Sequence, residues 1–161
     1  MKALLGDDIR NALDATGVDY RVMACDPALA DTASFCEHYR QPLEKSANAI
    51  LVKSKAAEPR FALCVLLATT RLDVNKSVRH QLGAKRASFA SAEETREQTG
   101  MEIGGVTPLG LPAHIELLVD QRIAELDFII LGGGSRTAKI FVSPQLFEHL
   151  PNASFVAGLA K

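Results

Sequence analysis

The amino-acid sequence predicts a domain of the mixed α/β class. Two apolar runs, residues 49–52 and 61–67, have the length and composition of strands that are buried on both faces. The polar segment 53–60 separates them and predicts that they pair as a hairpin. Further strand-like runs alternate along the chain with segments that carry helix-capping residues, so helices and strands are interspersed. We therefore expect a single domain with a mixed sheet at its centre and helices packed around it.

The bulk composition is that of an ordinary globular protein. The chain has 161 residues, of which 47% are hydrophobic and 23% charged, and one domain spanning residues 1–161 is the simplest division. The net charge of −1 gives no overall basic field, although a local basic patch is still open. Three cysteines without a Cys-x-x-Cys pair predict neither a disulfide framework nor a zinc site. With no apolar stretch of about 18 residues, we expect a cytoplasmic protein that does not enter a membrane.

The N-terminal third shows helical spacing, caps and one short strand. Gly17 is a natural stop for the first helix, and Pro42 sets a limit to the second. The predicted elements are a helix over residues 7–16, a strand over 20–23, a helix capped by Asp31 or Thr32, and a helical turn over 43–47.

The middle of the chain carries two capped helices around a candidate strand. Asp73 begins a helix that Gly83 closes, and residues 87–89 are a short strand. Ser91 and Glu94 have the capping-box spacing and open a helix that ends at Gly100. In the last third we predict strands over residues 115–119, 128–131 and 139–142, a turn capped by Asp120, and a helix that starts at Ser143-Pro144 and runs to Leu150.

Residues 104–112 form the most distinctive segment, Gly-Gly-Val-Thr-Pro-Leu-Gly-Leu-Pro. Proline fixes φ and lacks an N–H, whereas glycine reaches φ > 0, so neither a helix nor a central strand can continue through this segment. We expect an ordered loop whose backbone amides turn outward to meet an oxygen-rich ligand. The alternative is a tight connection between two elements and nothing more.

Several common kinds of site are not indicated. Gly132-Gly133-Gly134 follows a strand but lacks the third glycine of a dinucleotide fingerprint, and no phosphate-binding P-loop occurs. The four histidines have no partner at metal-ligand spacing, and no nucleophile elbow is present. An enzyme with this sequence would work without a side-chain nucleophile, and the residues predict no metal site. His114, directly after the loop, is either a ligand contact or a solvent-facing side chain.

Basic residues recur near the predicted hairpin, the Asp73 helix and the glycine-rich turn. If several shared a face with the loop they would suit a phosphate backbone, and otherwise they are a solvated surface. The candidate cations for binding such a backbone are Lys53, Lys76, Arg79, Lys85, Arg86 and Lys139.

The order and spacing of these segments resemble the YbaK/EbsC family, the free-standing relatives of the prolyl-tRNA synthetase editing domain. The resemblance covers roughly residues 20–150. The residues that carry it are the strand after Ala47, the Asp73 helix followed by Gly83-Ala84-Lys85, Thr99-Gly100, Asp120, the turn containing Gly134 and, most specifically, Gly104-Gly105-Val106-Thr107-Pro108-Leu109-Gly110.

The resemblance implies the family's fold and a function: hydrolysis, in trans, of the ester in a mischarged tRNA that carries a small amino acid. It implies no cofactor, the acceptor end of tRNA as partner, and an aminoacyl-tRNA synthetase as a further candidate partner. The loop would position the aminoacyl carbonyl and the terminal ribose, with backbone N–H groups stabilising the developing oxyanion. Carried onto this chain, the catalytic positions are Asn48, Gly105, Thr107 and Gly110, and the substrate-binding positions are Val106, Pro108, Leu109, Gly134 and His114.

Asn48 departs from the family pattern, which has a lysine directly before the first central strand. Asparagine keeps a hydrogen-bond donor but loses the positive charge, a change that costs about 1–2 kcal/mol where a charge-assisted bond is replaced by a neutral one. Lys45 lies three residues upstream, and a shift of three would spoil the strand register. Two hypotheses follow: a deacylase adapted to Asn48, or a tRNA or aminoacyl-adenosine binding protein without turnover. We expect the loop and Gly134 to line one pocket with Asn48 at its rim.

Overall fold

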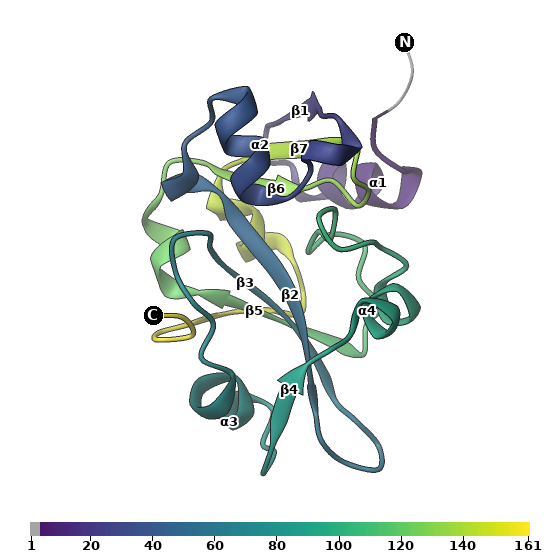
Figure 1. Ribbon diagram of the computed structural model, residues 1–161, viewed down its shortest axis with the longest axis vertical. Coiled ribbons are helices and arrows are strands. Elements are labelled where there is room, and N and C mark those ends of the chain that lie inside the picture. Colours follow the sequence, from purple (N-terminus) through teal and green to yellow (C-terminus); the bar gives the residue numbers. More distant parts are fainter. Residues whose placement is uncertain (1–3) are drawn as a thin grey trace.

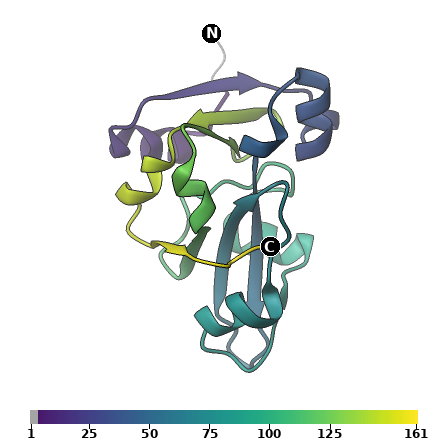
Figure 2. The same cartoon turned by 90° about the vertical axis from the view of Figure 1, so that its left-hand side faces the viewer.

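The computed structural model describes residues 4–161, so the first three residues of the predicted domain lie outside the described residues. Its strands form two sheets. The order in the larger sheet is β4-β2-β3-β5-β8, and in the smaller sheet β1-β7-β6. The strands are β1 (Tyr20–Ala24), β2 (Ala47–Ser54), β3 (Phe61–Leu67), β4 (Ala87–Phe89), β5 (Ile115–Asp120), β6 (Ile129–Gly132), β7 (Ala138–Val142) and β8 (Ala153–Val156). Figure 2 shows the small sheet lying across one end of the β2–β3 hairpin.

Short helices connect and cover these sheets (Figure 1). The α-helices are α1 (Asp7–Thr16), α2 (Thr32–Tyr39), α3 (Arg79–Gln81) and α4 (Ala92–Thr99). The 3-10 turns are η1 (Pro27–Leu29), η2 (Leu43–Lys45), η4 (Gln121–Glu125) and η5 (Pro144–His149), and a π-helical turn, η3 (Val74–Val78), precedes α3. No helix among residues 4–161 is long and apolar enough to cross a membrane.

The predicted hairpin lies at the centre of the larger sheet. β2 and β3 pair antiparallel, with Ala47 opposite Leu67, and β3 continues into a parallel pair with β5. Alternate residues of β3 enter different cores: Leu63 and Val65 share a core with the small sheet, whereas Cys64 shares a core with the buried side chains of η3. Burial on both faces is why the run from 61 to 67 is apolar at every position. The predicted mixed α/β class with helices around a mixed sheet is confirmed.

Local signals account for the element boundaries. Asp73, Asp120 and Ser143 each accept a backbone N–H at the start of a turn, as their positions predict. The Ser91–Glu94 capping box is complete, since each side chain binds the other residue's backbone N–H. The predicted C-terminal helix is instead a 3-10 turn, and the edge strand β8 that follows it was not predicted. The division of the strands into two sheets was not predicted either.

Candidate active site at the free edge of β2

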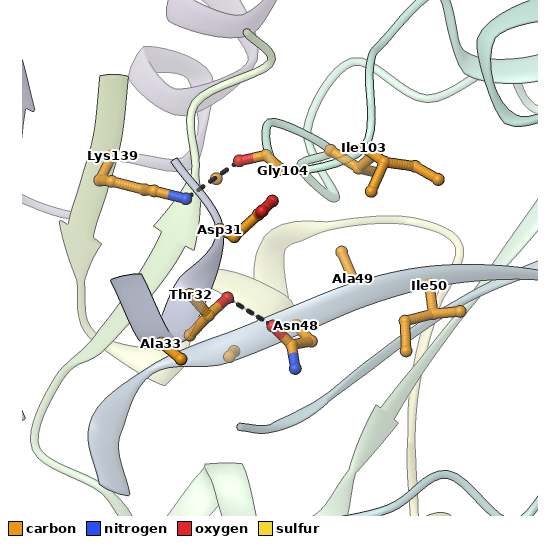
Figure 3. Close-up of a pocket in the computed structure, with 12 residues that line it drawn as sticks. Asp31, Thr32, Ala33, Asn48, Ala49, Ile50, Ile103, Gly104 and Lys139 are labelled. Atoms are coloured by element: carbon orange, nitrogen blue, oxygen red, sulfur yellow. Dashed lines mark hydrogen bonds between the residues drawn. The ribbon is translucent and has the colours of Figure 1, made fainter. Parts of the chain in front are cut away.

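A cavity of about 330 Å³ lies where the edge of β2 meets the loop before β5 and the small sheet. β4 pairs with β2 only over Val52–Ser54, so the backbone of residues 47–50 has no β4 partner and leaves room there. We call this space the edge cavity (Figure 3). It is lined by Asp31, Thr32, Ala33, Ala47, Asn48, Ala49, Ile50, Ile103, Gly104, Val106, Gly132 and Lys139.

Close backbone packing holds the loop wall of the edge cavity. Gly104 has φ +93°, a conformation that favours glycine. A Cβ on Gly105 would overlap the backbone of Ser135, and one on Gly132 would overlap the carbonyl oxygen of Val106. The Gly134 N–H donates to the Gly105 carbonyl at 2.6 Å. The glycines of both segments therefore allow the loop to lie directly on the β6–β7 turn.

The loop amides do not all point outward as the sequence predicted. The Gly105 N–H donates to the Glu102 carbonyl at 2.9 Å, and the Thr107 N–H lies 3.4 Å from the Met101 sulfur. That prediction is wrong for these two residues, because the loop is a compact turn that satisfies them internally. Thr107 is 0% exposed, and its hydroxyl finds no partner among residues 4–161. Val106 lines the edge cavity, and its N–H donates to no backbone carbonyl within the described chain.

The loop contributes to two separate pockets, which corrects the expectation of a single one. Gly104 and Val106 line the edge cavity, whereas Leu109, Gly110 and Gly134 line a second space of about 350 Å³ beside the start of α1. We call this second space the α1 pocket. Thr107 and Pro108 are buried and line neither. The physical reason is that the loop is a wall between two spaces and presents a different face to each.

Asn48 is fixed by the first residue of α2. The Thr32 hydroxyl donates to the Asn48 side-chain oxygen at 2.5 Å, which leaves the amide nitrogen without a hydrogen bond to any described residue. Because side chains alternate along a strand, Asn48 projects from the opposite face of β2 to Ala49. Figure 3 shows Ala49 on the side of Gly104 and the Asn48 amide nitrogen turned the other way. Asn48 therefore lies at the rim of the edge cavity, with its donors free.

Lys139 brings a positive charge into the edge cavity from β7. Its Nζ donates to the carbonyl oxygens of Ala30 at 2.5 Å and Gly104 at 3.0 Å, and the residue is only 5% exposed. Burial lowers the pKa of Lys139; Cys25 and Asp31 act against this lowering, and Arg136 adds to it. The sequence predicted Lys139 as a surface contact for tRNA, but its side chain lies inside the edge cavity.

Arg136 braces the mouth of the edge cavity. Its guanidinium donates to the Pro27 carbonyl at 3.0 Å, the Ile103 carbonyl at 2.7 Å and the Asp31 carboxylate at 3.2 Å. These bonds tie the loop, the start of α2 and the β6–β7 turn together. The Ile103 side chain remains 54% exposed at the rim. Sequence reasoning missed Arg136, Asp31 and Thr32 as site residues, and only the position of Arg136 two residues after the glycines pointed to it.

The remaining cations are not gathered around the edge cavity. Lys53 pairs with Glu94 at 2.5 Å farther along β2. Four others, Lys76, Arg79, Lys85 and Arg86, lie on η3, α3 and the segment before β4. Figure 1 shows α3 and β4 at the end of β2 away from α2. Six residues separate Asn48 from Ser54, where β4 pairs, which is about 20 Å along a strand. His114 is exposed and bonds Gln98 at 2.8 Å.

The edge cavity offers donors on one side and a carboxylate at its mouth. Its described lining has no Ser, Cys or His, so it holds none of the usual nucleophile and base pairs. It is lined by Lys139 and Val106, and the Asn48 amide lies at its rim. Such groups can bind a polar ligand and stabilise a developing negative charge.

Comparison with known proteins finds a matching family. A profile of the aminoacyl-tRNA editing domain family matches residues 26–150. The chain belongs to this family. The resemblance seen in the sequence is thereby confirmed, over nearly the span that the motifs predicted.

Individual relatives of the editing-domain chain are more distant. It is 36% identical over 83 residues to the uncharacterized protein YwhH of Bacillus subtilis, a match that covers 52% of each chain. It is 29% identical over 108 residues to a proline–tRNA ligase of Paraburkholderia phymatum, covering 66% of this chain and 18% of the ligase. The match thus spans about half the length of the first relative and less than a fifth of the second.

Two crystal structures share the fold of this editing domain. The hypothetical protein APE2540 superposes with a TM-score of 0.85 at 24% identity, covering 96% of this chain and 100% of the other. A protein proposed as a trans-editing enzyme for prolyl tRNA synthetase superposes with a TM-score of 0.76 at 20% identity, covering 98% of each. These likenesses support the fold.

Proposed function

We propose that this editing domain hydrolyses the ester of a mischarged tRNA carrying a small amino acid, acting in trans on the acceptor end. The observation that carries the proposal is the edge cavity, which in a chain of the editing-domain family opens between Asn48 and the Gly104–Val106 wall. Its volume of about 330 Å³ admits an aminoacyl group, and in this proposal the nucleotides of the acceptor end lie at its mouth.

The reaction would place the aminoacyl ester against the loop wall. In this arrangement the Val106 N–H is the candidate donor to the carbonyl, and the Asn48 amide at the rim is the candidate donor to the terminal ribose. A water molecule attacks the carbonyl and loses a proton, with a free hydroxyl of the ribose available to orient it; the tetrahedral intermediate collapses to the free amino acid and the tRNA 3′ oxygen, which is protonated as it leaves. The protein contributes positioning and donors, which act most strongly where charge develops.

The four cations around α3 and β4 suit the acceptor stem. Lys76, Lys85 and Arg86 are exposed, and Arg79 is half-buried. A tRNA whose 3′ end enters the edge cavity could lay its stem along β2 toward them. Reversing the charges of Lys85 and Arg86 together should weaken tRNA binding and reduce the dependence of the binding constant on salt, since each phosphate contact contributes a slope of roughly −0.7 to −0.9. An unchanged salt dependence would remove these residues from the interface.

A second candidate is a protein that binds tRNA or aminoacyl-adenosine without turnover. The Asn48 side chain favours it, because no lysine stands at that position to assist catalysis. A synthetase partner is proposed on the similarity to proline–tRNA ligase alone.

The experiment that separates these candidates is single-turnover release of labelled amino acid from a panel of mischarged tRNAs. The deacylase proposal expects release that is faster than in buffer for at least one tRNA. Binding without release across the panel would favour the second candidate, and neither binding nor release would contradict both.

A further inference from the structure

Lys139 is the only cation among the described residues that line the edge cavity. An ammonium group carries three N–H donors, and two of them bind the carbonyls of Ala30 and Gly104. The third donates to no described residue, while the Phe35 ring lies 5.5 Å from Nζ on the buried side. Figure 3 shows the side chain reaching from β7 toward Gly104.

A structural cross-link alone does not account for a charged group at this position. Removing an ammonium from water is costly, and two neutral carbonyls compensate only part of that cost. The carboxylate of Asp31 is 67% exposed at the mouth and is bound to Arg136. The charge of Lys139 therefore has no buried counter-ion among residues 4–161, and a ligand oxygen in the cavity would complete its bonding.

Depth decides which part of a ligand can reach Lys139. The buried lining residues are Ala47, Val106 and Lys139, whereas Asp31 and Ile103 at the mouth are exposed. In the proposed reaction the terminal nucleoside of the substrate lies at this exposed mouth. The part that reaches the buried end is the small group esterified to it.

We propose that Lys139 recognises an oxygen on the side chain of the aminoacyl group, so that the substrates carry a side-chain hydroxyl or carboxylate and not a hydrocarbon. This inference rests on the proposed function and names its substrate class. It also makes Lys139 a specificity-determining residue, distinct from the surface contact for tRNA that the sequence indicated.

Physical chemistry predicts a large discrimination. A hydrophobic pocket separates close analogues weakly, whereas a site built around a buried polar group rejects an analogue that leaves that group unpaired. A hydrogen bond to a charged donor corresponds to about 10- to 100-fold in the specificity constant. Threonine and valine have nearly the same shape, so the ratio of their rates isolates the oxygen.

The test compares hydrolysis of four charged forms of one tRNA by the full chain. Threonyl and valyl esters test a hydroxyl, and aspartyl and leucyl esters test a carboxylate. Each is assayed with wild type, with Lys139→Met and with the control Lys55→Met, which changes an exposed lysine outside the cavity. We expect wild type to prefer threonyl over valyl, or aspartyl over leucyl, by at least about tenfold. Lys139→Met should abolish that preference, and Lys55→Met should retain it.

Other results overturn the inference. Equal rates for both members of both pairs in wild type would contradict it, whether or not the variant folds. A preference that persists in Lys139→Met would give Lys139 a structural role. A uniform loss on all four esters would mean that Lys139 contacts a group common to all substrates.

Binding of hydrolysis-resistant amide analogues provides a second measurement. Preferential binding of the threonyl or aspartyl analogue without hydrolysis would contradict the deacylase alone, and no preference in either assay would contradict the inference.

Discussion

The loop of residues 104–112 separates two pockets of similar size with opposite chemistry. The edge cavity, on the side of Gly104 and Val106, contains a buried ammonium and the open edge of a strand, and the Asp31 carboxylate at its mouth is paired with Arg136. The α1 pocket, on the side of Leu109 and Gly110, is lined by the carboxylates of Asp7 and Asp8. An RNA end carries negative charge, so it is attracted to the first and repelled by the second. The glycine-rich loop therefore separates two pockets, and the charged residues of each pocket decide which one binds the ligand.

The largest expected effect is the difference in hydrolysis rate between two glycine substitutions, one on each face of the loop. Gly105→Ala should lower hydrolysis by at least about 100-fold, because the new Cβ overlaps the Ser135 backbone and displaces the cavity wall. Gly110→Ala should reduce the free energy of unfolding by about 1–2 kcal/mol through its left-handed backbone, with φ +70°. Its hydrolysis rate should stay near that of wild type. The measurements are single-turnover hydrolysis and denaturant unfolding, and a larger kinetic effect at Gly110 would reverse the assignment.

The next effect tests whether Asn48 is adapted to its site. Asn48→Lys brings a second ammonium into the cavity that contains Lys139, and Asn48→Ala leaves the Thr32 hydroxyl without its acceptor. Both should lower hydrolysis, each by about tenfold for a loss near 1.4 kcal/mol. Thr32→Val, which keeps the amide but removes its partner, should have a smaller effect. A rate that rises in Asn48→Lys would show instead that the chain has lost a charge it could use.

A smaller effect is expected on the other side of the wall. Asp8→Asn removes an acidic side chain from the first turn of α1, where it interacts favourably with the helix dipole. The free energy of unfolding should fall by about 0.3–1 kcal/mol, and the hydrolysis rate should not change. A clear change in rate or substrate affinity would place the ligand in the α1 pocket.

The smallest effect is in the pH dependence of stability. Burial lowers the pKa of Lys139, so above that lowered pKa the unfolded chain binds more protons at this site than the folded chain. Stability should therefore rise with pH between the lowered pKa and the ordinary lysine value, and Lys139→Met should lack this rise. Burial raises the pKa of the Cys25 and Cys64 thiols, which act in the opposite direction. Cys64 does so equally in both proteins, whereas Cys25 loses the lowering effect of Lys139 in the variant, which increases the difference between the two curves. A Lys139→Met curve parallel to that of wild type would contradict the burial of a charge.

Local signals in the sequence were enough for most of the fold. The hairpin of β2 and β3 follows from apolar runs that are buried on both faces, and the Ser91 and Asp120 caps follow from side-chain chemistry at helix starts. β8 was missed because Ala153–Val156 is a short edge strand whose pairing with β5 is long-range. The family resemblance pointed to Asn48 and to part of the loop, Gly104 and Val106, which line one cavity, but not to the second pocket on the other side of the loop.

The remaining parts of the site depend on tertiary packing that no local pattern encodes. The direction of Lys139 is set by the pairing of β7 with β1 and β6, and in the sequence this residue looks like any lysine after a turn. The partition of the loop between two pockets depends on where α1 packs. Thr32 becomes a site residue only because α2 places it beside Asn48.

The most direct test of the account is to fill each pocket separately and measure single-turnover hydrolysis. Ala49→Phe adds a ring on the Gly104 side of β2, inside the edge cavity. Gly6→Phe adds the same ring in the α1 pocket, where Gly6 has an ordinary extended backbone and open space around its Cβ position. We predict that Ala49→Phe abolishes release of the amino acid while the folded state is retained, and that Gly6→Phe releases it at the wild-type rate. Loss of release in Gly6→Phe together with normal release in Ala49→Phe would contradict the assignment of the active site to the edge cavity.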